Sequence, residues 1–210
     1  MLARLAALLL LLPLGACSSS IWQESYRPSP LAPQGPAPTR LPPSTPILVR
    51  EAPWDRVDAA LAQLARDEAA SDIHISQWPE DRRLHAVASI LLALQLQDDP
   101  AQVIILGSSS FATTDPIRPD SGALEAHARR LGADTAIWTS RVLGRGTRVV
   151  DRPVTIHHHG WDRYYDRDDH VWRSQYDSHL DTAWVPVTID ADRVAYVAFY
   201  LRRSAPTPTP

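Results

Sequence analysis

Five of the eight histidines lie in residues 157–181, a segment that also contains several aspartates. Neutral imidazole and carboxylate groups are the usual protein ligands of Zn²⁺, Cu²⁺ and Ni²⁺. His157 and His159 would point to the same side of an extended strand, and His170 or His179 would join them if the segment folds back as a hairpin. No His-Glu-x-x-His signature accompanies them. The segment therefore predicts either a site for a divalent transition metal or a solvated hairpin with clustered polar residues.

The same segment is rich in aromatic side chains, which can bind a partner instead of a metal. They are Trp161, Tyr164, Tyr165, Trp172 and Tyr176. Aromatic and arginine side chains are typical anchors of protein interfaces, and aromatic rings also stack on sugars. The alternative is that these rings pack against their own hairpin. We expect a binding surface here, for an envelope protein or a cell-wall polymer.

Catalytic chemistry has less support. Ser108, Ser109 and Ser110 follow Gly107, but a nucleophile elbow requires glycine on both sides of the serine. His170 lies beside Asp168 and Asp169 without a recognisable motif around the pair. The prediction is a protein that is not an enzyme, with hydrolase chemistry as the weakest alternative.

The N-terminus indicates where the protein is located. Residues 1–16 combine an early arginine, a short apolar run and small residues before a cleavage site, as in a secretory signal peptide. The run is too short for a membrane-spanning helix, and Pro13 interrupts it. Leu14-Gly15-Ala16-Cys17 resembles the lipobox of bacterial lipoproteins, which implies cleavage before Cys17 and lipidation of its thiol. Ser18, where an aspartate often marks inner-membrane retention, favours the periplasmic face of the outer membrane.

Composition excludes several further classes. The chain has 210 residues, 21 basic residues that are all arginine, and a formal net charge of −3, which argues against a nucleic-acid partner. Cys17 is the single cysteine, so its acylation would leave no thiol for a disulfide, a zinc site or a nucleophile.

Nineteen prolines, concentrated toward the two ends, set the expected organisation of the chain. Residues 17–46 are expected to be a disordered, extended linker behind the lipidated cysteine, with Trp22 and Tyr26 at the lipid interface. Residues 205–210 are expected to be a disordered tail. The remaining residues, 47–204, are long enough for one domain with its own core.

Hydrophobic periodicity predicts the elements of that domain. Apolar residues recur at helical spacing twice within residues 54–98, and residues 72–77 alternate weakly as a short strand would. Residues 102–201 predict a strand, a helix ended by Gly132, and then four antiparallel strands with turns at 144–146 and 190–192. Residues 157–181 form the polar and aromatic hairpin loop between them. The expected fold is α+β, a mainly antiparallel sheet with helices packed on one face.

Three short pieces carry a resemblance: Ile104–Phe111, Ala126–Asp134, and Val185–Thr188 followed by Ala195–Tyr200. Together they resemble a loose set of uncharacterised bacterial envelope lipoproteins, in which a Gly-x-Ser-x-Phe strand end precedes Leu-Gly-Ala-Asp and then Val-Pro-Val-Thr. The resemblance implies a small α+β domain and an envelope location. It implies no catalytic residue.

The sequence thus predicts a non-enzymatic, lipid-anchored outer-membrane protein. Its partners would be the membrane, through Cys17, and an envelope protein or cell-wall polymer, through residues 157–181. The alternative function is a periplasmic metal-binding lipoprotein that uses the four histidines.

Overall fold

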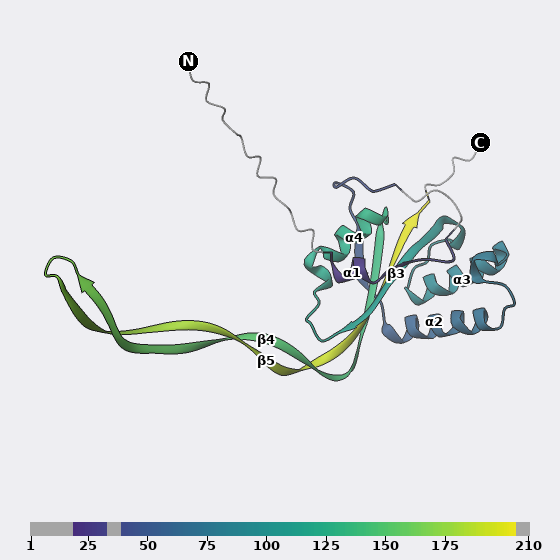
Figure 1. Cartoon of the computed structure of the whole chain (residues 1–210). Helices are drawn as coiled ribbons and strands as arrows, with labels where there is room; N and C mark the ends of the chain where they lie inside the picture. Colours follow the sequence, from purple (N-terminus) through teal and green to yellow (C-terminus); the bar gives the residue numbers. More distant parts are fainter. Residues whose placement is uncertain (1–18, 33–38, 205–210) are drawn as a thin grey trace, which may run out of the picture. The chain divides into compact units, whose positions relative to one another are not determined.

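The computed structural model describes residues 19–32 and 39–204 (Figure 1). The predicted signal peptide 1–16, Cys17 and the tail 205–210 lie outside the described residues. The chain divides into two compact units, which we call the body and the hairpin unit. The described body comprises residues 19–32, 39–111, 119–139 and 197–204, and the hairpin unit comprises residues 112–118 and 140–196.

Five strands form one mixed sheet in the order β1-β3-β5-β4-β2. Their bounds are β1 Tyr26–Pro28, β2 Leu48–Glu51, β3 Val103–Thr113, β4 Thr135–Asp166 and β5 Val171–Arg203. β1 runs antiparallel to β3, and β2 runs parallel to β4, pairing with residues 135–138. This sheet, with the helices around it, confirms the α+β class and its mainly antiparallel pairing.

Two helices pack on one face of the sheet: α2, Trp54–Ala69, and α3, Glu80–Ala93. Both helices predicted in residues 54–98 are therefore present. Their apolar sides join alternate residues of β5, Val197, Phe199 and Leu201, in one buried core. The α2–α3 connection holds a single 3₁₀ turn, Ile75–Gln77, so the strand predicted at 72–77 is wrong.

The opposite face is covered by α4, Ala123–Leu131, and the short α1, Ile21–Glu24. Tyr200, which alternates with the core residues of β5, places its ring 5.0 Å from that of His127 on α4. The expectation of helices on one face thus describes α2 and α3, while the second helical layer is built from α4 and α1. Gly132 ends α4 at φ +78°, as predicted, because glycine tolerates this left-handed conformation.

The segment 19–32 is part of the body, so the linker prediction is wrong for these residues. Trp22 is 2% exposed, and its ring meets that of Phe111 edge to face at 4.8 Å. Tyr26 pairs with Ser109 in the β1–β3 ladder. In place of the expected lipid contact, both rings pack on rings of the body, Trp22 on Phe111 and Tyr26 on His127 and Tyr200. The prolines were expected to prevent strand pairing. They do not, because β1 is an edge strand, where Pro28 removes no donor that the sheet requires.

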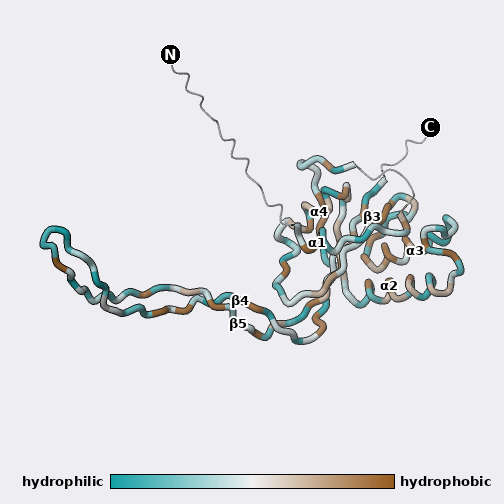
Figure 2. The backbone as a smooth tube through the Cα atoms, in the orientation of Figure 1, coloured by the Kyte–Doolittle hydropathy of each residue, from teal (hydrophilic) through white to brown (hydrophobic). Residues whose placement is uncertain are grey.

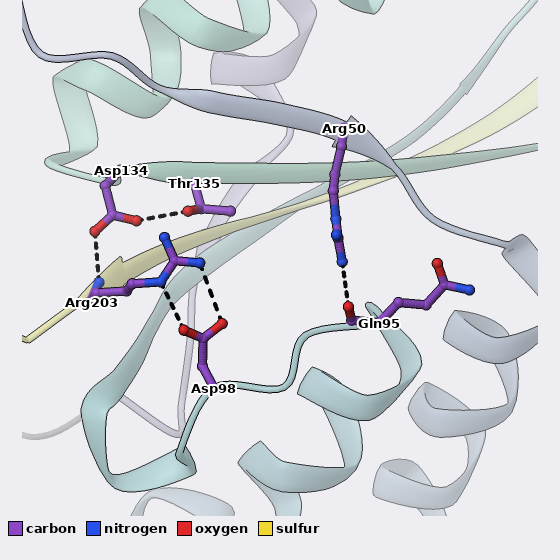
Figure 3. Close-up of polar contacts among 6 residues, drawn as sticks. All are labelled: Arg50, Gln95, Asp98, Asp134, Thr135 and Arg203. Carbon is purple, nitrogen blue, oxygen red and sulfur yellow. Dashed lines mark hydrogen bonds and ion pairs between the residues drawn. The ribbon is translucent and has the colours of Figure 1, made fainter.

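A cluster of polar contacts fixes the C-terminal end of β5 (Figure 3). The Arg203 guanidinium donates to both oxygens of Asp98, at 2.9 and 3.3 Å, and its backbone N–H donates to Asp134 at 2.7 Å. The hydrogen bond from Arg203 lowers the pKa of Asp98. Arg50 donates to the Gln95 carbonyl at 2.7 Å, where the chain leaves α3. These contacts tie β2, β4 and β5 to the segment after α3.

The two predicted turns are also wrong, because β4 and β5 run through them without a break. A Cβ built on Gly146 would lie 3.7 Å from the Arg193 Cβ and 4.0 Å from the Ala191 carbonyl oxygen. The two glycine- and aspartate-rich segments are therefore neighbours across the ladder. Gly144 adopts φ +142° here, a conformation that glycine tolerates, and the strand continues through it.

If Trp22 belongs to the core, Trp22→Ala should lower the free energy of unfolding by about 3–5 kcal/mol, because it removes a fully buried aromatic side chain. Trp184→Ala is the control, since Trp184 is 66% exposed and its loss should change stability by about 0.5 kcal/mol or less. Denaturant unfolding of the full chain measures both. Equal stability of the Trp22 variant and the wild type would contradict the packed N-terminal segment.

Candidate binding surface

The segment 157–181 is the far end of a two-stranded hairpin made by β4 and β5 (Figure 1). The strands reverse at residues 167–170, where His170 adopts φ +55°. Asp166 accepts hydrogen bonds from the N–H groups of Asp168 and Asp169, at 3.1 and 3.4 Å, and forms an ion pair with Arg173 at 2.9 Å. Apart from His170 in the turn, the residues of both predicted sites therefore lie on strands.

Two ring contacts across the ladder define these faces. Tyr165 and Trp172 lie 5.4 Å apart, and His158 stacks on His179 at 5.2 Å with 19° between the ring planes. Both pairs fit one antiparallel register. Because successive side chains alternate between faces, Trp172 and His179 belong to opposite faces of β5.

One face of β5 carries no charged residue over thirteen positions. Every second residue from Trp172 to Trp184 forms what we call the uncharged stripe: Trp172, Ser174, Tyr176, Ser178, Leu180, Thr182 and Trp184. The other face presents Arg173, Gln175, Asp177, His179 and Asp181. At about 3.3 Å per residue, the stripe is about 40 Å long. The hydropathy colouring shows the mixture of polar and apolar positions along both strands (Figure 2).

The large side chains of the stripe are exposed. Trp172, Leu180 and Trp184 are 67%, 65% and 66% exposed, and Tyr176 is 53% exposed. The predicted binding residues Tyr165, Trp172 and Tyr176 thus share one face, whereas Tyr164 alternates to the other. The side chain of Trp161 lies outside the described part of the chain. Leu180 and Trp184 were not predicted, although the period-two alternation from residue 172 onward was a signal for them.

The four predicted metal ligands do not come together. His157 and His159 share one face of β4, as expected, but His158 between them is the residue that faces His179. His179 Nδ1 lies 2.9 Å from an oxygen of Asp177, and His170 is in the turn. Within residues 19–32 and 39–204, no group of three or more His, Cys, Asp or Glu side chains could hold a metal ion. The geometry therefore does not favour the metal alternative.

Ser109, one of the serines considered as a nucleophile, lies inside the body. Ser109 is fully buried, and its hydroxyl donates to the Trp22 carbonyl and lies 2.9 Å from the Tyr200 hydroxyl. His127 is also nearby, with its ring against those of Tyr26 and Tyr200. These groups join α1, β3, β5 and α4 on the second face of the sheet.

A surface hollow in the body lies between α3 and the start of β3. Its lining includes Glu80, Arg83 and Val103, and it holds no cluster of titratable groups.

No described helix combines the length and the apolarity needed to cross a bilayer. Comparison of the chain with protein-family models, with curated proteins and with solved structures finds no match.

Burial of His127 gives a prediction for stability against pH. Burial, with a contribution from Arg130, lowers the pKa of His127 to about 4, and neither ring nitrogen has a hydrogen-bond partner. Since the unfolded chain has the ordinary histidine pKa near 6.5, it binds more protons than the folded chain between about pH 4 and 6.5. Because of this histidine, the free energy of unfolding should be on the order of 3 kcal/mol lower at pH 4 than at neutral pH.

His127→Phe keeps a ring in this position and removes the titration. Its free energy of unfolding should fall less steeply than that of the wild type between pH 6.5 and 4. Equilibrium unfolding at a series of pH values measures the difference. Parallel pH profiles would show that His127 is not held neutral by its burial.

Proposed function

We propose that this protein is a non-enzymatic lipoprotein of the outer membrane, on its periplasmic face, that binds an envelope protein or a cell-wall polymer through the hairpin unit. The observation that carries the proposal is the uncharged stripe of β5, with its exposed Trp172, Leu180 and Trp184. Several large side chains that lie exposed along one face are typical of a surface that meets a partner.

Stability of the ribbon supports the same proposal. A two-stranded hairpin is marginal in water on its own, and further strands or a packed layer are needed to stabilise it. Most residues between Val171 and Pro186 are exposed, so this part of the ribbon has no core of its own. A partner that covers the stripe would supply the missing layer.

The chemistry of the stripe also suits binding. Trp and Tyr are enriched at the centres of protein interfaces, because they bury a large area with few rotatable bonds. Serine and threonine between them offer hydroxyl groups to backbone or sugar partners without the desolvation cost of a charge. A stripe that alternates large rings with small hydroxyl side chains can meet a protein or a glycan.

The location rests on the signal-like residues 1–16 and on the lipobox-like ending at Cys17. Lipidation of this cysteine would hold the protein at the membrane, since several acyl chains together give long-lived attachment.

A photo-crosslinking amino acid at Tyr176, introduced into the full chain in a Gram-negative envelope, tests the binding surface. We expect adducts with an envelope protein or with peptidoglycan. The matched control is the same amino acid at Gln175, the adjacent residue on the charged face, which should give few adducts. Equal yields at the two positions, or none at Tyr176, would contradict the uncharged stripe as the binding surface.

Cys17→Ser tests the anchor. The wild type should fractionate with the outer membrane, and the variant should be recovered from the soluble fraction of the envelope. Metabolic labelling with a radioactive fatty acid should mark only the wild-type chain. Unchanged membrane association and labelling of the variant would exclude lipidation at this residue.

A further inference from the structure

The pairing of β4 with β5 identifies the β4 residues that lie beside the uncharged stripe. Three pairs of neighbours along the hairpin fit one register: Tyr165 with Trp172, His158 with His179, and Gly146 with Ala191. Residues directly opposite each other in an antiparallel pair have their side chains on the same face. The stripe, residues 172–184, therefore lies opposite residues 153–165 of β4.

The β4 half of this face adds basic and polar side chains to the stripe. Its described side chains are Pro153, Thr155, His157, His159, Arg163 and Tyr165. We call this half together with the uncharged stripe the stripe face. The side chains of His157, His159 and Arg163 are exposed. Two of the histidines considered as metal ligands thus lie beside the exposed rings of the stripe.

Formal charge separates the two faces of the hairpin over these residues. With histidine neutral, the stripe face has one arginine and no acidic residue, a formal charge of +1. The other face has Arg173 against Asp162, Asp177 and Asp181, a formal charge of −2. Asp151 is the next residue of the stripe face toward the body, so the acid-free part ends at Pro153. An anionic partner is repelled by one face and not by the other.

The two arginines also differ in whether their charge is already used. Arg173 forms ion pairs with Asp166, at 2.9 Å, and with Asp169. Arg163 forms no ion pair with another described residue. An exposed guanidinium without a carboxylate partner can bind one from another molecule through two parallel hydrogen bonds.

The spacing of the rings favours a glycan over a protein as the partner. Along β5, Trp172 and Tyr176 are about 13 Å apart, and Tyr176 and Trp184 are about 26 Å apart, at about 3.3 Å per residue. Between them lie serine, threonine and a single large aliphatic residue, Leu180. The centre of a protein interface is a contiguous, closely packed apolar patch, which separated rings do not form. Separate rings with hydroxyl groups between them suit a linear polymer of sugars.

We propose that the stripe face binds peptidoglycan, the carboxylate-bearing glycan of the cell wall, along the length of the hairpin. This inference rests on the proposed binding function of the hairpin unit, and it commits that function to one ligand class. The rings stack on sugar faces, and the serine and threonine hydroxyls bond to sugar hydroxyl and amide groups. Arg163 binds a peptide carboxylate, and the imidazole N–H groups of His157 and His159 donate to further acceptors of the polymer.

Co-sedimentation of the purified full chain, in mild detergent, with three polymers tests the ligand class. The polymers are native peptidoglycan sacculi, sacculi whose carboxyl groups have been amidated with ethanolamine, and chitin, a neutral polymer of an amino sugar. We expect binding to native sacculi, several-fold weaker binding to the two uncharged polymers, and a loss of this difference at high salt. Equal binding to native and amidated sacculi would overturn the role of the carboxylates.

Two matched triple variants test the face. The stripe-face variant carries His157→Gln, His159→Gln and Arg163→Gln. The control carries His158→Gln, His179→Gln and Arg173→Gln, the same residue types on the other face. The first should bind native sacculi several-fold more weakly than the wild type, and the second should bind like the wild type. Circular dichroism checks that both keep the wild-type strand content, and an equal loss of binding in two folded variants would overturn the stripe face as the site.

The photo-crosslinking result at Tyr176 separates this inference from the proposed function. Adducts of Tyr176 with an envelope protein, without co-sedimentation of the chain with native sacculi, would overturn the inference and leave the binding function standing. Absence of both adducts and co-sedimentation would overturn both.

Discussion

The central strand β5 has to satisfy two different environments along its length, and the rest of the structure follows from this constraint. Near its end, Val197, Phe199 and Leu201 lie in the core with α2 and α3, while Tyr200 packs toward α4. Earlier in the same strand, alternate residues from Trp172 to Trp184 are uncharged, yet they are exposed and not buried. One continuous ladder with β4 therefore carries both the best-buried and some of the most exposed large side chains of the chain.

The body is held together by contacts within itself. Its sheet has a helical layer on each face, and its polar groups are used internally: Arg203 binds Asp98 and Asp134, and the Ser109 hydroxyl binds the Trp22 carbonyl. Such groups hold the second-face segments and the end of β5 in place. The hairpin unit has the opposite character, because large side chains such as Trp172, Leu180 and Trp184 are exposed.

Sequence patterns predicted the parts of the fold that depend on local chemistry. The apolar spacing of α2 and α3 and the glycine after α4 were sufficient, because a helix is specified by residues close in the chain. The packing of Trp22 was not predictable, since it depends on contacts with β3 more than 80 residues away. The turns predicted at 144–146 and 190–192 failed for a related reason: each segment is turn-like alone, and only their pairing with each other keeps both extended. In the candidate site, the aromatic residues were identifiable by type, but their division between two faces needed the register that the Tyr165–Trp172 and His158–His179 contacts define.

The central claim is that the uncharged stripe is covered in the cell. Oxidative footprinting of Trp172 and Trp184 tests it directly, by comparing the full chain in intact envelopes with the purified chain in detergent at low concentration. The account predicts that both indoles are oxidised readily in the purified chain, where they are 67% and 66% exposed, and are strongly protected in the envelope. Equal oxidation of both residues in the two preparations would contradict it.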